Sequence, residues 1–229
     1  MSAPAGARAA LFDLDGTLLD TARDMAAALN GLLVEEGRAA LALEVLRPHV
    51  SNGANGMVRT GFPGLEVSSS EFAQLRERFL ARYRSALCVH TRLFPGFEQV
   101  LAALESHGLP WGIITNKAAW LTEPLLEILG LRERAACVVS GDTLPERKPH
   151  PRPLLHAAHM IEVAPADCVY VGDALRDVQA ARAAGMVPLG VRFGYLNPAD
   201  DPGSWPVAGW LEEPRELLSW LALAPEGVH

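Results

Sequence analysis

The order of apolar and polar positions divides the chain into three parts with different periodicities. Residues 9–14 form a short apolar run that stops at Asp15-Gly16, which predicts a buried strand followed by a turn. From residue 20 to 87, apolar residues recur three or four positions apart, which predicts helices only, and residues 68–71 fit a helix capping box. After Pro95-Gly96, short apolar runs alternate with helical patterns. This last part predicts βαβ units and a parallel sheet with helices on both faces.

Together the three parts predict an α/β fold, a Rossmann-like parallel sheet that carries an inserted all-α cap domain. The strands expected in the sheet cover residues 9–14, 111–114, 137–139, 168–171 and 187–191. A helical stretch as long as 20–87 exceeds an ordinary connection, so we expect it to be the inserted domain. The catalytic core would then comprise residues 1–19 and 88–229. Trp111 and Trp120 are expected to pack in its interior.

Composition and charge narrow the range of partners. The 229 residues, 49% of them apolar and 21% charged, can build a sizeable core. The net charge is −7 and no basic block stands out, which argues against nucleic acid or an anionic membrane as a partner. The three cysteines match neither a disulfide framework nor a zinc site, and no run is long enough to cross a membrane. We therefore expect a cytoplasmic monomer or homodimer that acts on a small molecule.

Polar side chains follow directly after several of the expected strands. They are Asp13 and Asp15 after the first strand, Thr115 and Asn116 after 111–114, Lys148 in the connection after 137–139, and Asp173 with Asp177 after 168–171. In open α/β sheets, ligands bind at the carboxyl ends of the strands. We therefore expect these side chains to converge on one place.

A group of carboxylates with a lysine and a hydroxyl suits phosphoryl transfer. Neighbouring carboxylates repel unless a cation intervenes, and Mg²⁺ is usually held by carboxylates together with substrate phosphate. One carboxylate can act as nucleophile, and another can protonate the leaving alkoxide. Each residue also has a simpler interpretation. Asp13 and Asp15 can be turn residues, Lys148 a surface lysine, and Asp177 a helix-start residue favoured by the helix dipole.

Taken in order, these motifs resemble those of the haloacid dehalogenase-like phosphatases. D-x-D-G-T at residues 13–17, Thr-Asn after a strand, a lysine, and G-D-x-x-x-D at 172–177 occur in the order typical of that family. The resemblance implies a Mg²⁺-dependent phosphomonoester hydrolase that acts on a small phosphorylated metabolite through an aspartyl-phosphate. It assigns Asp13 as nucleophile and metal ligand, and Asp15 as general acid/base with its backbone carbonyl on the metal. Thr115 and Asn116 would bind the phosphoryl group, and Lys148 would stabilise charge on the phosphoryl group and the nucleophile. Asp173 and Asp177 would be metal ligands.

The cap and the loops resemble two groups within this family. Asn52-Gly53, in a glycine-rich loop of the cap, resembles phosphoglycolate phosphatases, and its backbone N–H groups could bind a small carboxylate of the substrate. The same two residues can also be only a turn. Residues 93–96, 115–117 and 192–195 more closely resemble N-acetylmuramic acid 6-phosphate phosphatases. We expect a phosphoglycolate phosphatase-like enzyme, with N-acetylmuramic acid 6-phosphate as the alternative substrate.

Two other functions share part of these motifs. A phosphosugar mutase has every core motif of this set. A regulatory module that binds a phosphoryl group on one aspartate is the non-enzyme alternative. Asp15 and the cap argue against the regulatory module, because it needs neither an acid for a leaving alkoxide nor a lid.

Overall fold

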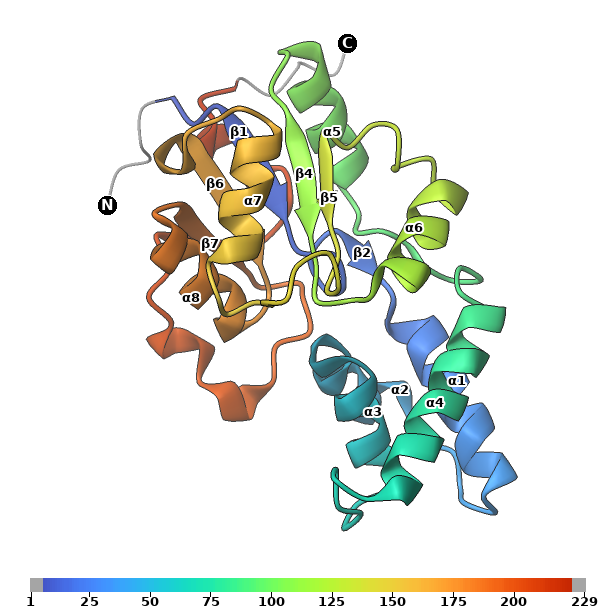
Figure 1. The fold of residues 1–229 in the computed structure, drawn as a ribbon. Coiled ribbons are helices and arrows are strands. Elements are labelled where there is room, and N and C mark those ends of the chain that lie inside the picture. Colours follow the sequence, from blue (N-terminus) through green and yellow to red (C-terminus); the bar gives the residue numbers. More distant parts are fainter. Residues whose placement is uncertain (1–5, 224–229) are drawn as a thin grey trace.

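The centre of the molecule is a six-stranded sheet in the order β5-β4-β1-β6-β7-β8, and all neighbouring strands are parallel (Figure 1). The structure is a computed structural model that describes residues 6–223. The strands of this sheet are β1 (Ala9–Phe12), β4 (Trp111–Ile114), β5 (Cys137–Val139), β6 (Cys168–Gly172), β7 (Val187–Val191) and β8 (Gly209–Leu211). The helices beside it are α5 (Phe97–Ser106), α6 (Ala119–Ile128), α7 (Arg152–Met160), α8 (Leu175–Ala184) and α9 (Glu216–Trp220). The predicted α/β fold class is confirmed.

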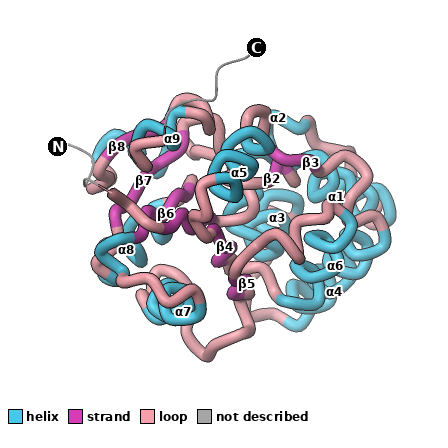
Figure 2. Tube along the Cα trace, turned by 90° about the horizontal axis from the view of Figure 1, so that it is seen from above, coloured by secondary structure: helices cyan, strands magenta, loops and turns pink. Residues whose placement is uncertain are grey.

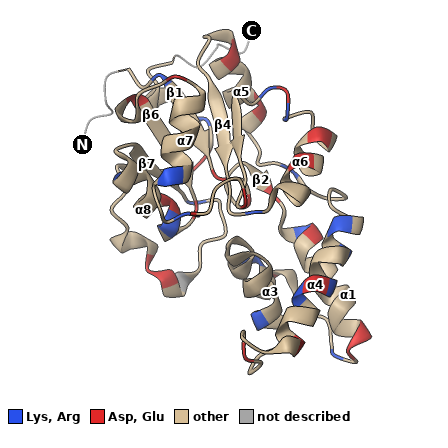
Figure 3. Ribbon diagram, viewed as in Figure 1, with Lys and Arg blue, Asp and Glu red and all other residues tan. Residues whose placement is uncertain are grey.

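Helices cover both faces of the sheet, so its strands are apolar on both sides. Seen from above, α7 and α8 lie on one face and α5 and α9 on the other (Figure 2). Along β1, Leu11 packs into the core under α7 and α8, while Phe12 packs on the opposite side with Phe97 and Trp111. The strands of this six-stranded sheet carry no Lys, Arg, Asp or Glu (Figure 3). Charged side chains therefore begin only where the strands end.

A second group of helices forms what we call the helical lobe, residues 22–85. It contains α1 (Ala22–Glu35), α2 (Leu43–Leu46), the 3₁₀ turn η1 (Arg47–Asn52), α3 (Gly53–Gly61) and α4 (Ser70–Ser85). Leu29, Met57 and Phe79 are fully buried and belong to its apolar core. Two short antiparallel strands, β2 (Leu19–Asp20) and β3 (Arg92–Leu93), carry the chain into the lobe and back. The helical lobe lies below the carboxyl end of β4 in the view of Figure 1.

Some element boundaries differ from the expectation. The segment after residue 19 is not helical throughout, because Leu19–Asp20 pairs with Arg92–Leu93. The α4 N-cap is Ser69, whose hydroxyl accepts a hydrogen bond from the Phe72 N–H at 3.1 Å. Strand β8 was not expected, because three residues are too few to show a periodicity. The division into residues 20–87 and the remainder stays a prediction. Its first boundary falls within β2, and its second lies shortly before β3.

The two tryptophans expected in the core have different environments. Trp111 is buried in the sheet, with 1% of its surface exposed. The expectation for Trp120 was wrong, because this side chain on the first turn of α6 is 46% exposed. Hydrophobicity alone does not distinguish a core aromatic from one beside a cavity. Within residues 6–223, no helix has the length and apolar character that crossing a membrane would need.

Candidate active site

The carboxyl ends of β1, β4 and β6 bring the expected polar residues together. Asp13 follows β1, Thr115 follows β4, and Asp173 follows β6. The turn after Asp13 must pass close to Asp173, and Gly16 makes this possible with a φ of +85°. A Cβ at Gly16 would lie 2.1 Å from Asp173 Oδ2, so any side chain there would disrupt this approach.

Of the two carboxylate oxygens of Asp13, Oδ1 has polar contacts with the protein and Oδ2 has none among the described residues. Its Oδ1 accepts the Leu14 N–H at 2.7 Å and lies 2.8 Å from Lys148 Nζ. No hydrogen bond or ion pair to Oδ2 occurs among the described residues. The side chain is nearly buried but lines the cavity described below. Asp13 thus presents one oriented oxygen to a ligand.

Lys148 is the buried cation of the site. Its ammonium lies 2.8 Å from Asp13 Oδ1 and 2.8 Å from Asp177 Oδ1. It also donates to the Ile114 carbonyl and to the Tyr170 hydroxyl, both at 2.7 Å. A buried ammonium needs such partners, because desolvation of a lone charge is very unfavourable. Lys148 therefore joins the ends of β1 and β4 to the start of α8.

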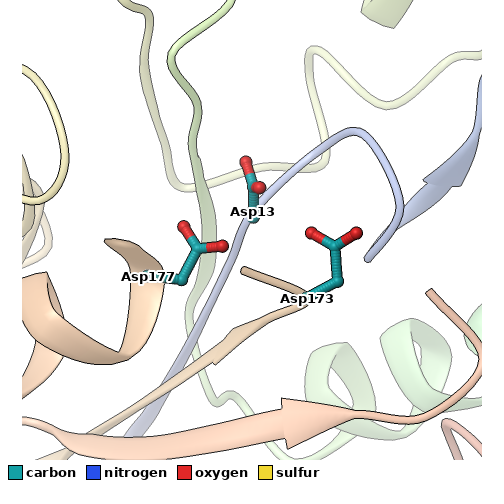
Figure 4. Close-up of side chains that lie close together, drawn as sticks. All are labelled: Asp13, Asp173 and Asp177. Carbon is teal, nitrogen blue, oxygen red and sulfur yellow. The ribbon is translucent and has the colours of Figure 1, made fainter. Parts of the chain in front are cut away.

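Asp13, Asp173 and Asp177 form an acidic cluster (Figure 4). Each offers a carboxylate oxygen within 4.8 Å of the others, and Oδ1 of the buried Asp173 has no hydrogen-bond partner in the described structure. Burial, with the nearby charges of Asp13 and Asp177, raises the pKa of Asp173 from 3.8 to about 7. Burial also raises the pKa of Asp177, although Lys148 acts in the opposite direction. Such a set of oxygen donors suits a hard divalent cation.

Asp15 forms an ion pair with a different lysine from the one that contacts Asp13. Its Oδ1 accepts the Thr21 hydroxyl at 2.7 Å and lies 3.0 Å from Lys117 Nζ. Lys117 Nζ also donates to the hydroxyl of Tyr83, on α4 of the helical lobe, at 3.2 Å. Burial alone would lower the pKa of Lys117, but Asp15 and Tyr83 reverse this and its pKa is raised. The contacts of Asp15 leave its Oδ2 available for a proton.

The two residues after β4 have different environments. The Thr115 side chain is nearly buried, and its hydroxyl accepts the Lys117 N–H at 3.1 Å. The Asn116 amide donates to the Lys148 carbonyl at 2.9 Å and accepts the Lys148 N–H at 3.1 Å. Both residues line the cavity. The Asn116 side-chain amide thus holds the Lys148 backbone, and binding of the phosphoryl group by Thr115 and the backbone beside it stays a prediction.

A cavity of about 350 Å³ is lined by residues of the sheet edge and of the helical lobe. The sheet contributes Asp13, Asp15 and Thr115 to its lining, and the helical lobe contributes Asn52 and Gly53, among others. The sequence-predicted residues of the lobe are therefore brought to the same cavity as the aspartates. Its volume is at the lower end of the range for small-molecule sites.

Several residues at the site were not singled out from the sequence. Ser51 donates to Asp173 Oδ2 at 2.6 Å, and the Tyr195 N–H donates to the same oxygen at 2.9 Å. Tyr170 lies within β6, and its hydroxyl accepts a hydrogen bond from the Lys148 ammonium. Lys117 could have been noticed because it follows Thr115-Asn116 at a strand end. Tyr195 belongs to the 192–195 motif, which by itself assigns it no role at the site. Ser51 and Tyr170 carry no such local signal, because distant segments bring them in.

Comparisons with known proteins agree with this arrangement. The family described as haloacid dehalogenase-like hydrolase matches residues 10–191, which include Asp13 through Asp177. A phosphoglycolate phosphatase from Xanthomonas campestris pv. campestris is 48% identical over 210 residues, covering 92% of this chain and 94% of that protein. An N-acetylmuramic acid 6-phosphate phosphatase from Pseudomonas putida is 40% identical over 210 residues, with the same coverage of 92% and 94%. Among solved structures, a predicted phosphoglycolate phosphatase from Haemophilus somnus has a TM-score of 0.82 at 26% identity, covering 93% of this chain and 96% of that chain.

Proposed function

The chain belongs to the haloacid dehalogenase-like hydrolases and is a phosphatase, and we propose that it cleaves a small phosphorylated metabolite through an aspartyl-phosphate on Asp13. The observation that carries this proposal is the orientation of Asp13. Leu14 and Lys148 hold its Oδ1, so Oδ2 is the oxygen that can attack a phosphorus atom in the cavity. Lys148 disperses negative charge on the nucleophile and on the incoming phosphoryl group.

The two aspartates then have separate roles. Asp13 Oδ2 forms a bond to phosphorus while the bond from phosphorus to the ester oxygen breaks, and protonated Asp15 gives its proton to the leaving alkoxide. Asp15, now a carboxylate, takes a proton from water as that water attacks phosphorus. The bond between phosphorus and Asp13 Oδ2 breaks, which releases phosphate and restores Asp13. Lys117 and Thr21 hold Asp15 in place for both proton transfers.

We further propose that Asp13, Asp173 and Asp177 hold Mg²⁺, with the Asp15 backbone carbonyl. The support is the all-oxygen donor set, the unpartnered Asp173 Oδ1, and the raised pKa of Asp173, which burial and the nearby carboxylates of Asp13 and Asp177 cause. When bound, Mg²⁺ neutralises charge on the phosphoryl oxygens. Asp177 also keeps Lys148 in position through its ion pair.

One candidate substrate is 2-phosphoglycolate, which the names of several relatives indicate. N-acetylmuramic acid 6-phosphate is the second candidate, supported by relatives with 40% and 39% identity. Both compounds carry a phosphoryl group and a carboxylate. We also propose that the protein works in the cytoplasm, because Cys88, Cys137 and Cys168 are free thiols.

The test is hydrolysis of p-nitrophenyl phosphate. Asp13→Asn keeps the shape of the side chain but removes the nucleophile, so we expect no detectable release of p-nitrophenol. EDTA should abolish the activity of the unmodified protein, and Mg²⁺ should restore it. Asp167→Asn is the matched control, because Asp167 precedes β6 at the end of the strand opposite the site. Full activity of Asp13→Asn, or of the EDTA-treated protein, would contradict the proposal.

Two product measurements address the alternatives. A phosphosugar mutase would convert a hexose 1-phosphate to an isomer without releasing phosphate, whereas a phosphatase releases phosphate. A regulatory module would accumulate a long-lived phosphorylated Asp13. We expect phosphate release and rapid turnover of the phosphorylated aspartate.

A further inference from the structure

Two of the four cationic side chains that line the cavity have no partner within residues 6–223. Lys117 is paired with Asp15, and Arg176 donates to the Ser51 carbonyl at 2.6 Å. The guanidinium groups of Arg76 and Arg147 make no hydrogen bond or ion pair with any described residue. These two groups can therefore receive an anion from the substrate without breaking an internal contact.

Arg76 lies well away from the reacting atoms. On α4, Arg76, Leu80 and Tyr83 are spaced to share one face, and all three line the cavity. Tyr83 marks the reacting end, because its hydroxyl meets the Lys117 ammonium that pairs with Asp15. Seven residues of helix separate Tyr83 from Arg76, which is about 10 Å along the axis. Arg76 is thus positioned for a part of the substrate other than the phosphoryl group.

The cavity also offers an apolar surface between polar groups. Leu80 lies one helical turn from Arg76, and the half-exposed indole of Trp120 lines the same cavity from α6. An exposed tryptophan beside a ligand site provides a flat apolar face with low entropy cost on binding. A sugar ring has C–H faces that match such a surface. This arrangement suits a substrate in which a ring separates two charged ends.

We propose that Arg76 binds a carboxylate at the end of the substrate remote from the phosphoryl group, so that phosphorylated sugar acids are preferred over 2-phosphoglycolate. The proposal rests on the phosphatase activity proposed above. A guanidinium can bind a carboxylate through two parallel hydrogen bonds, which gives both affinity and orientation. In 2-phosphoglycolate a single methylene separates the carboxylate from the ester oxygen, so this carboxylate stays near Asp13 and does not reach Arg76.

The experiment compares two sugar phosphates that differ only in the lactyl ether, the group that carries the carboxylate. N-acetylmuramic acid 6-phosphate carries a lactyl ether, and N-acetylglucosamine 6-phosphate is the same sugar without it. We expect the unmodified protein to have a higher kcat/KM for the acid. In Arg76→Gln, the ratio of the two kcat/KM values should fall roughly ten- to a hundredfold, the size of a lost hydrogen bond to a charged group. Most of this change should appear in KM for the acid.

Two further variants make the measurement specific. Arg76→Lys retains the charge but not the paired hydrogen bonds, and we expect it to recover part of the ratio. Arg78→Gln removes the same charge from the opposite face of α4, where Arg78 pairs with Glu35 and Glu36, and should leave the ratio unchanged. Each variant is assayed in parallel with 2-phosphoglycolate, for which the unmodified protein should have a lower kcat/KM than for the sugar acid.

The outcomes separate this proposal from the function on which it rests. If p-nitrophenyl phosphate is hydrolysed but the two sugar phosphates react equally well, the carboxylate site is refuted and the phosphatase assignment stands. The same conclusion follows if Arg76→Gln and Arg78→Gln change the ratio equally, or if 2-phosphoglycolate is the better substrate. If no phosphate ester is hydrolysed, including p-nitrophenyl phosphate, both proposals fail.

Discussion

At the scale of single residues, the two aspartates after β1 differ in the cations that hold them. Asp13 is paired with the almost fully buried Lys148, which Asp177 shares. Asp15 is paired with Lys117, which reaches the helical lobe through Tyr83. The first pair lies inside the sheet and the second at the junction of sheet and lobe. This difference fits the separate roles proposed for the two carboxylates, Asp13 as nucleophile and Asp15 as proton donor.

We predict that Lys117→Gln lowers kcat for p-nitrophenyl phosphate roughly ten- to a hundredfold, because Asp15 loses the charged hydrogen bond that orients it. Tyr83→Phe, which removes only the hydroxyl contact to Lys117, should have a smaller effect. Steady-state kinetics on both variants provide the measurement. Equal losses in the two variants would mean that Lys117 acts on the lobe and not on Asp15.

The raised pKa of Asp173 predicts how pH and Mg²⁺ affect stability. The folded protein without metal holds a proton on Asp173 up to about pH 7, whereas the unfolded chain releases it near 3.8. This stabilising contribution is therefore complete below 3.8 and disappears as the pH rises through about 7. Mg²⁺ binds the ionised form, so its stabilising effect should be larger at high pH.

The measurement is the thermal unfolding midpoint with Mg²⁺ and with EDTA, at pH 5.5 and pH 8. We expect the difference between the two additions to be clearly larger at pH 8. In Asp173→Asn this pH dependence should be much weaker. A Mg²⁺ effect that is the same at both pH values would contradict the assignment of the site.

At the scale of elements, α4 has two functions on adjoining faces. One face packs against α1 in the core of the helical lobe through Phe79, which stacks on the Tyr83 ring with centroids 6.4 Å apart. The other carries Arg76 and Leu80 to the cavity. Ser69 begins the helix with a side-chain cap, so the register of both faces is set at its first turn. The positions of Arg76 and Leu80 in the cavity therefore depend on how α4 packs in the core of the helical lobe.

We predict that Phe79→Ala lowers the free energy of unfolding by about 3–5 kcal/mol, because it leaves a cavity in the lobe. Arg84→Ala, an exposed position on the same helix, should change it by less than about 0.5 kcal/mol. Urea unfolding followed by circular dichroism gives both values. A loss of the same size in the two variants would show that helix propensity, and not packing, stabilises α4.

At the scale of the whole molecule, Tyr195 joins the sheet to the helical lobe. Its hydroxyl accepts the Thr21 and Ala22 N–H groups at 2.6 and 2.9 Å and donates to Asp20 Oδ1 at 2.7 Å. The Arg47 guanidinium of the lobe covers the Tyr195 ring at 4.7 Å from its centroid. Because the Tyr195 N–H also binds Asp173, one residue contacts both the acidic cluster and the entrance to the lobe.

We predict that Tyr195→Phe lowers the free energy of unfolding by about 1–3 kcal/mol, because the buried Thr21 N–H loses its acceptor and the Ala22 N–H keeps only the longer contact to Asp20 Oδ1 at 3.4 Å. The aromatic contacts remain in this variant. Tyr83→Phe is the control, since that hydroxyl has a single polar contact, and a smaller loss is expected. Urea unfolding would contradict the role of Tyr195 if the two substitutions had equal effects.

The strands and the polar residues at their ends were predictable because both are encoded locally. A run such as residues 9–12 has to be buried, and parallel strands bring their carboxyl ends to one edge. Asp13, Lys148 and Asp173 could therefore be named, and their convergence expected, before the fold was known. The very short strands β2, β3 and β8 could not, because two or three residues carry no periodicity.

The α/β class and the helical pattern of residues 20–87 could be predicted from the order of neighbouring residues, and so could the acidic residues that follow the strands. Only the tertiary structure decided that Lys117 pairs with Asp15, that Asn116 holds the Lys148 backbone, and that Trp120 lines the cavity. It also decided that Arg76 lines that cavity, seven residues along α4 from Tyr83. The physical reason is that these contacts join segments distant in the chain, so they depend on how the helical lobe packs against the sheet.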